Sequence, residues 1–144
     1  MKVRSICFYF IFFFIAVSNA FASKVTSDLR CFVETSAKKI KLEMRLYSDE
    51  THNWTGGYVK YGKNRTPISI VFHATKPIDQ SSGRPSYFES TWIEIASAEV
   101  AGKYTIGTQG ANVYSLEYVG RDLKKKYSFD ETTERNSTDD ECKW

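Results

Sequence analysis

Catalytic chemistry in a chain of this size would most readily use histidine, and the chain has only two, His52 and His73. A Ser–His–Asp or Cys–His site needs a histidine aligned with a nucleophile and with an orienting carboxylate. His52 falls in a polar turn and His73 near the end of an apolar run, and neither stands near a Gly-x-Ser-x-Gly or similar motif. We interpret them as a surface histidine and a strand-end histidine, and we predict no catalytic residue.

Paired carboxylates could hydrolyse a glycoside, and Glu89 and Glu94 flank Trp92, on which a sugar ring could stack. On a strand, however, residues five apart point to opposite faces, so these two carboxylates should not converge without a bulge. An alternative is an enzyme whose carboxylates meet only in the fold, for instance Glu89 or Glu117 with Asp122.

Metal chemistry is not expected either. Zinc needs three or four His, Cys or carboxylate ligands at characteristic spacings, and the cysteines are assigned to a disulfide below. Calcium could be bound only in the acidic tail, which has neither the EF-hand spacing nor its glycine. The tail carboxylates are Asp130, Glu131, Asp139, Asp140 and Glu141. We expect a solvated acidic tail and no metal or cofactor.

Residues 1–22 have the layout of a secretory signal peptide. Lys2 and Arg4 precede an uncharged run from Ile6 to Val17, and a small-x-small cleavage site ends at Ala22. About a dozen apolar residues are fewer than the roughly twenty that a membrane span needs. We therefore predict cleavage after Ala22, with an uncleaved anchor as the alternative. The mature chain, residues 23–144, should be soluble and periplasmic, or secreted if the host is not a Gram-negative bacterium.

The charge of the mature chain is nearly balanced. Removal of Lys2 and Arg4 leaves 18 basic residues against 17 acidic ones. This balance gives no reason to expect a nucleic-acid partner or binding to an anionic membrane.

The mature chain keeps two cysteines, Cys31 near its start and Cys142 near its end. In an oxidising compartment such a pair is expected to form a disulfide. Closing a loop of about 110 residues would stabilise the fold by roughly 4–5 kcal/mol in the chain-entropy model. The alternative is two free thiols.

Alternation of polar and apolar residues predicts an all-strand fold. It is strict from Lys39 to Tyr47, which predicts a strand with one buried face and one solvated face. Further runs of this kind recur at short, regular spacing, whereas 76–86 reads as a long loop and 130–143 as a loop tail. We expect one antiparallel meander of seven or eight strands, closed as a small barrel or sandwich.

Some loops carry residue types that are common in protein interfaces. Trp54 and Tyr58 flank a pair of glycines, and Gln109 and Asn112 flank a second glycine turn. Lys76, Asp79 and Arg84 belong to the long loop. We interpret these seven residues as candidate partner contacts. The alternative is that Trp54 and Tyr58 pack in the core while Gly56 and Gly57 form a bulge.

The layout resembles that of small bacterial periplasmic inhibitor and immunity proteins. Lysozyme inhibitors of the MliC/PliC type are exported β-barrels of similar size with a cysteine on the first strand and another near the end. Here the sequences Leu29-Arg30-Cys31 and Ile40-Lys41-Leu42 and the distal Cys142 have that arrangement. The pesticin immunity protein is similar in size and expected compartment. The resemblance implies a protein that binds and neutralises a secreted enzyme or toxin.

Three functions follow from these patterns. The first is a periplasmic immunity or inhibitor protein for a bacteriocin or cell-wall hydrolase. The second is a small-ligand carrier that uses the barrel interior, although many Tyr and Ile side chains should fill it. The third is an unrecognised secreted hydrolase. The sequons at Asn53, Asn64 and Asn136 would carry glycans only in a eukaryotic host.

Overall fold

The computed structural model describes residues 24–63, 65–80, 82–133, 135–136 and 141–144. The expected signal peptide and its cleavage site lie outside the described residues. Within them the chain forms ten strands and no helix: β1 (Thr26–Glu34), β2 (Lys41–Asp49), β3 (Trp54–Tyr61), β4 (Ile68–Asp79), β5 (Tyr87–Ala96), β6 (Glu99–Gln109), β7 (Asn112–Gly120), β8 (Lys126–Thr132), β9 (Arg135–Asn136) and β10 (Glu141–Cys142).

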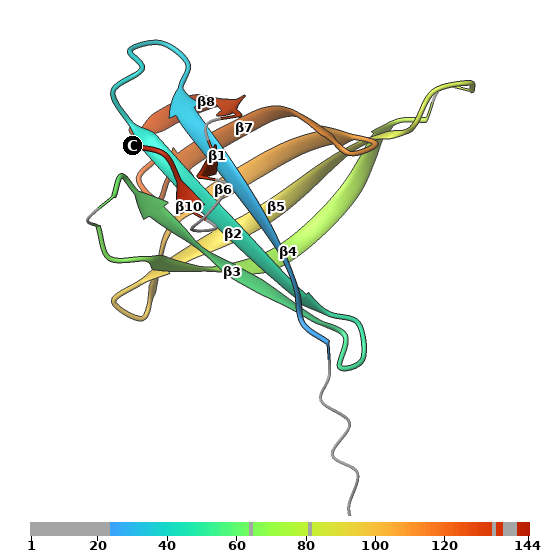
Figure 1. The fold of residues 1–144 in the computed structure, drawn as a ribbon, viewed down its shortest axis with the longest axis horizontal. Helices are drawn as coiled ribbons and strands as arrows, with labels where there is room; N and C mark the ends of the chain where they lie inside the picture. The colour runs from blue at the N-terminus through green and yellow to red at the C-terminus, as the bar shows by residue number, and fades with distance from the viewer. Residues whose placement is uncertain (1–23, 64, 81, 134, 137–140) are drawn as a thin grey trace, which may run out of the picture.

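The first eight strands form a closed antiparallel barrel in which each strand pairs with the next along the chain (Figure 1). The barrel closes where β1 pairs with β8, from Cys31–Thr132 to Glu34–Phe129. The mainly β fold, the meander and the strand number are thus as the alternation predicted, and the architecture is the barrel rather than the sandwich. β9 and β10 form a separate small sheet.

The middle of the barrel is filled by side chains. The core contains Phe32, Leu42, Met44, Val59, Ile70, Trp92, Tyr104, Ile106, Leu116, Tyr118 and Phe129. These residues come from all eight strands and follow the period of two that points alternate side chains inward. Interdigitated aromatic and aliphatic groups of this kind make the centre of a small barrel a packed core.

Three boundaries predicted from the sequence were wrong. β4 extends to Asp79, so the loop expected from residue 76 begins only at residue 80. The sequence predicts a strand over residues 58–61 that two glycines open, but β3 already begins at Trp54. Gly56 and Gly57 pair regularly with Tyr47 and Leu46 inside the strand, so they do not form the bulge given as the alternative. The tail expected to be loop contributes the end of β8 and both strands of the small sheet.

One solvated face was also predicted wrongly. The alternation in β2 placed Glu43 beside Lys41 on the outer face, and Lys41 is indeed exposed. Glu43, however, is fully buried, because the C-terminal segment crosses the outside of β1 and β2 and covers it. A pattern of period two identifies the two faces of a strand but not what packs on the outer one.

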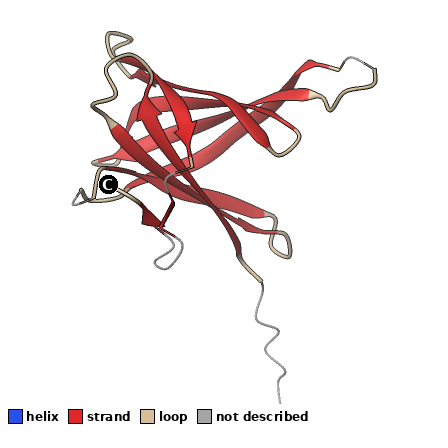
Figure 2. Ribbon diagram, turned by 45° about the horizontal axis from the view of Figure 1, so that its top comes forward, coloured by secondary structure: helices blue, strands red, loops and turns tan. Residues whose placement is uncertain are grey.

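The two ends of the barrel differ. At one end, which we call the open end, the hairpin turns β2–β3, β4–β5 and β6–β7 protrude (Figure 1). Pairing between β3 and β4 runs only from Val59–Ile68 to Gly56–Val71, although β4 continues for eight more residues. In both ribbon views the β2–β3 and β4–β5 hairpins diverge beyond this point (Figure 2). At the opposite end lie the turns β3–β4, β5–β6 and β7–β8.

Candidate functional site: the open end of the barrel

The most prominent feature of the open end is an arm formed by Phe72–Asp79 of β4 and Tyr87–Thr91 of β5. These two segments pair with each other from Ala74–Thr91 to Asp79–Tyr87, with bulges at His73 and Ile78. β6 continues alongside β5 as far as Tyr87–Gln109, so the β5 edge of the arm is covered. On the β4 edge, the described pairs with β3 stop at Val71. The arm therefore presents one strand edge away from the sheet.

Apolar side chains gather at this end. Of the nine large hydrophobic residues that the described part of the chain leaves exposed, seven lie here: Val25, Trp54, Val71, Phe72, Ile78, Phe88 and Tyr114. Trp54 and Ile78 are each 51% exposed. Phe72 packs edge-on against Trp92, with ring centroids 5.4 Å apart. Exposed apolar groups concentrated at one place are typical of an interaction surface.

Most of the candidate partner contacts from the sequence come together at this end. Lys76 and Asp79 are exposed on β4, and Arg84 is exposed in the β4–β5 loop. Gln109 ends β6 and Asn112 begins β7, in direct register across the turn. The Gln109 side chain donates a hydrogen bond to the carbonyl oxygen of Pro85 at 2.8 Å, which ties the β6–β7 turn to the β4–β5 loop.

Trp54 and Tyr58 have different surroundings. Trp54 is on the β2–β3 hairpin, at the same end as the arm, so its exposure argues against the core interpretation. Tyr58 lies on the outer face of β3, where its hydroxyl donates to Glu43 and accepts a hydrogen bond from Arg45. Desolvation by burial and then the hydrogen bond to Glu43 raise the pKa of Tyr58. Tyr58 is thus bound into a polar network below the disulfide.

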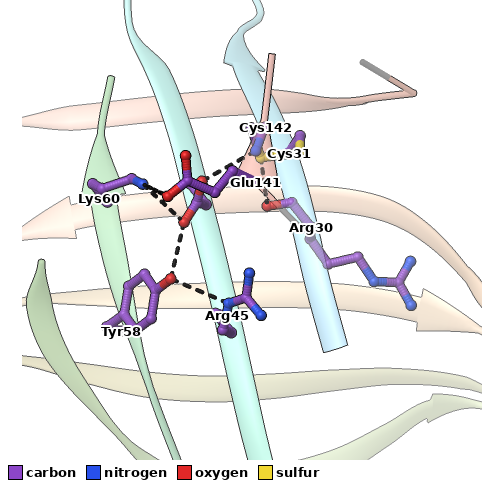
Figure 3. The surroundings of a disulfide bond; sticks show 8 residues. Arg30, Cys31, Arg45, Tyr58, Lys60, Glu141 and Cys142 are labelled. Atoms are coloured by element: carbon purple, nitrogen blue, oxygen red, sulfur yellow. Dashed lines mark hydrogen bonds and ion pairs between the residues drawn. A yellow bond between two sulfur atoms is a disulfide. The ribbon is translucent and has the colours of Figure 1, made fainter. Parts of the chain in front are cut away.

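That network holds the C-terminal segment on the barrel (Figure 3). The disulfide predicted between Cys31 and Cys142 is present and joins residues 111 positions apart. Glu43 accepts hydrogen bonds from the Tyr58 hydroxyl at 3.0 Å and from the Cys142 main chain at 3.2 Å. Lys60 forms an ion pair with Glu43 at 3.2 Å. The disulfide is therefore coupled to a buried pair of charges.

Two small clefts lie at the open end. One, of about 260 Å³, is lined by Leu46, Thr55 and Trp92 together with the first residues of β1. Within the described residues, the indole N–H of Trp92 is buried without a hydrogen-bond partner. The other, of about 420 Å³, includes Trp54 and Val71. The first cleft is lined from β1, β2, β3 and β5, and the second lies along β2, β3 and the paired part of β4.

Sequence reasoning missed the apolar residues of the arm. The run from Ile68 to Ala74 is β-branched and apolar, which is typical of a strand buried on both faces. The structure buries Ile70 but leaves Val71 and Phe72 exposed, because the strand departs from β3 there. A period of two shows which side chains share one face of a strand. Where the pairing with β3 ends depends instead on the register between distant strands.

The carboxylate pairs considered for hydrolysis, Glu89 with Glu94 and Glu89 or Glu117 with Asp122, do not converge in the fold. Glu89 forms an ion pair with Lys76 on the arm at 3.2 Å, and Glu94 faces the interior at the opposite end of the barrel. The two point to opposite faces, as their spacing predicted. Glu117 is exposed on β7, whereas Asp122 lines a cleft with Glu94.

The histidines and the tail have simple surroundings. His52 is exposed and hydrogen-bonds Asp49 through Nδ1 at 2.8 Å, and His73 is exposed at a bulge of β4. Asp130 binds Lys38, and Glu131 binds Arg30. Among the described residues, no three His, Cys, Asp or Glu side chains come together as a metal-binding group. The same residues include no helix long and apolar enough to cross a membrane.

Comparison of the chain with protein-family models, with curated proteins and with solved structures gives no match.

Proposed function

We propose that this chain is an exported binding protein that neutralises a bacteriocin or a cell-wall hydrolase by binding it at the open end of the barrel. The observation that carries the proposal is the arm, where exposed apolar side chains stand beside a strand edge that β3 leaves uncovered. Such an edge offers main-chain donors and acceptors to an extended segment of a partner.

The chemistry of the arm suits a protein partner. Its apolar groups, such as Phe72, Ile78 and Phe88, alternate with polar ones, among them the Lys76–Glu89 ion pair. Aromatic side chains and arginine commonly provide most of the binding energy of an interface, and Arg84 lies at the tip of the arm. Main-chain pairing along β4 would supply affinity, and the side chains on its two faces would supply specificity.

The rest of the molecule suits rigid presentation of this surface. The filled core fixes the strands, and the disulfide with its Glu43 network holds the C-terminal segment to the outside of β1–β3. A binding surface that is ordered before contact loses less conformational entropy on association. Preorganisation of this kind favours tight binding to a secreted enzyme.

The test is an inhibition titration with the oxidised mature domain, residues 23–144. Purified peptidoglycan hydrolases and bacteriocins are each assayed with increasing amounts of the domain. We expect the activity of at least one of them to fall to zero at a one-to-one ratio. Unchanged activity across the panel at micromolar domain would overturn the proposed function.

A further inference from the structure

Among the residues that the structure describes, two glutamates are buried, and they differ in their partners. Glu43 is fully enclosed by an ion pair with Lys60 and by hydrogen bonds from Tyr58 and Cys142. Glu94 is 5% exposed at the opposite end of the barrel, where it accepts a hydrogen bond from the Tyr104 hydroxyl at 2.6 Å. No lysine, arginine or histidine of the described chain forms an ion pair with Glu94. Burial of a carboxylate without a counter-ion is costly.

A chain of tyrosines holds the Glu94 carboxylate in place. Tyr104 uses its proton to donate to Glu94, so the hydrogen bond between Tyr61 and Tyr104 must be donated by Tyr61. Both hydroxyl protons therefore point along the chain toward the carboxylate. The Tyr104 and Tyr118 rings lie 4.8 Å apart and pack beside it. The group is fixed as an acceptor in aromatic surroundings.

Glu94 is nevertheless within reach of a ligand. It lines two adjoining clefts, of about 560 and 650 Å³, which also share Tyr118 and Lys125. These volumes lie in the range of small-ligand sites. The walls of the larger cleft include Tyr61, Tyr118 and Tyr127, and the last two rings stack at 6.3 Å. Tyrosine faces beside a carboxylate attract an organic cation.

The rim of the larger cleft has the opposite charge. Arg65 and Lys125 both line it and are exposed, and neither forms an ion pair within the described residues. In the smaller cleft Asp122 accepts a hydrogen bond from the Lys124 main chain at 3.1 Å. Burial, followed by the charges of Glu94 and Asp122, raises the pKa of Tyr118. The site thus combines a negative, aromatic floor with a basic rim.

We propose that this cleft binds a small zwitterion, an α-amino acid with an apolar or aromatic side chain. Its ammonium group would pair with Glu94, its carboxylate would face Arg65 and Lys125, and its side chain would lie against Tyr61, Tyr118 and Tyr127. This site is at the other end of the barrel from the partner-binding arm, and it does not depend on the proposed function.

Three probes that share a phenyl ring test the contributions of the ammonium group and of the carboxylate separately. Titration calorimetry on the oxidised domain, residues 23–144, would use L-phenylalanine, phenethylamine and 3-phenylpropionate. We expect phenylalanine to bind most tightly, phenethylamine more weakly and 3-phenylpropionate most weakly. Equal affinities for all three, or no binding of any at millimolar concentration, would overturn the proposal.

Two variants assign the charges to residues. Glu94→Gln keeps an acceptor for Tyr104 but removes the counter-ion, so affinity for phenylalanine and phenethylamine should fall on the order of tenfold or more. Lys125→Ala should lower the affinity for phenylalanine toward that for phenethylamine, and it should leave the affinity for phenethylamine unchanged. Glu117→Gln, at an exposed position of β7, is the matched control and should change nothing. Full affinity of Glu94→Gln, checked for folding by thermal melting, would contradict the assignment. If that variant does not fold, the Lys125→Ala result and the three-probe order decide.

Discussion

The main-chain N–H of Cys142 donates a hydrogen bond to Oε2 of Glu43 at 3.2 Å, although 99 positions separate the two residues. This contact links the C-terminal disulfide to the buried Glu43–Lys60 pair on β2 and β3. The last residues of the chain therefore take part in the stability of the barrel itself. They shield an ion pair that would otherwise face water.

Reduction of the disulfide should destabilise the barrel strongly. Cys31 and Cys142 are 111 positions apart, and breaking the disulfide between them removes about 5 kcal/mol of loop-closure stabilisation in the chain-entropy model. Release of the C-terminal segment also exposes Glu43 and Lys60 to solvent. Denaturant unfolding with and without reductant measures the difference, with a Cys31→Ser/Cys142→Ser variant as the irreversible form. Equal free energies of unfolding would show that the segment does not stabilise the barrel.

Removal of one member of the buried Glu43–Lys60 pair should lower the free energy of unfolding more than removal of both. Lys60→Met leaves Glu43 charged and buried, which should cost about 3–5 kcal/mol of stability. In Glu43→Leu/Lys60→Met no buried charge is left, and the free energy of unfolding should return toward that of the parent. Urea denaturation of the single and double variants measures both values. A double variant less stable than Lys60→Met would contradict this account.

Adjacent glycines in β3 should differ in their tolerance of alanine. A Cβ at Gly57 would lie 2.3 Å from the carbonyl oxygen of Arg45, a main-chain atom that cannot move without disturbing β2. A Cβ at Gly56 would lie 2.8 Å from the exposed ring of Trp54, which can rotate away. We expect Gly57→Ala to cost about 1–3 kcal/mol and Gly56→Ala clearly less. Thermal melts of the two variants test the order, and the reverse order would refute it.

High pH should unfold the protein through its buried tyrosines. Burial raises the pKa values of Tyr61 and Tyr104 in the fold, above the value of about 10 for an exposed tyrosine. The stabilisation is complete below the unfolded value and is lost as the pH rises above about 10, because only the unfolded chain then releases these protons. The free energy of unfolding should fall by about 1.4 kcal/mol per pH unit for each tyrosine.

A tyrosine-to-phenylalanine variant isolates that effect. Denaturant midpoints measured between neutral and strongly alkaline pH give the slope for the parent and for Tyr61→Phe. The variant should show a shallower decline above the pKa of free tyrosine. Tyr114→Phe, at an exposed position of β7, is the control and should keep the parental slope. Identical slopes for all three proteins would remove Tyr61 as a source of the alkaline instability.

Much of the fold was predictable for two reasons. Polar and apolar alternation is a local signal of a strand, and export to an oxidising compartment favours a disulfide. The strict alternation from Lys39 to Tyr47 predicted β2, and the two cysteines of an exported chain predicted the disulfide. The burial of Glu43 was not predictable, because it depends on a tail about a hundred positions away. The same limit applies to Glu94, whose inward direction follows from its parity with Trp92 but whose cleft depends on β3, β7 and β8.

The candidate site was predictable in its polar part and at Trp54, but not in the apolar residues of the arm. Lys76, Asp79 and Arg84 stood out because they lie in or near a segment rich in Pro, Ser and Gly. The apolar residues Phe72 and Ile78 did not, since a sequence pattern cannot tell an apolar strand inside a sheet from one that extends beyond it. The uncovered edge of β4 exists because its register ends the pairing with β3 at Val71 while the strand itself continues to Asp79.

The most direct test of the central claim compares two matched surface variants in binding to a hydrolase or bacteriocin that the domain inhibits. Ile78→Ser/Phe88→Ser removes two exposed apolar groups from the arm, and Val100→Ser/Leu123→Ser removes two from the opposite end. Calorimetry should show a loss of affinity on the order of a hundredfold for the arm variant and the parental affinity for the other. Parental affinity of the arm variant, or an equal loss in both, would contradict binding at the open end.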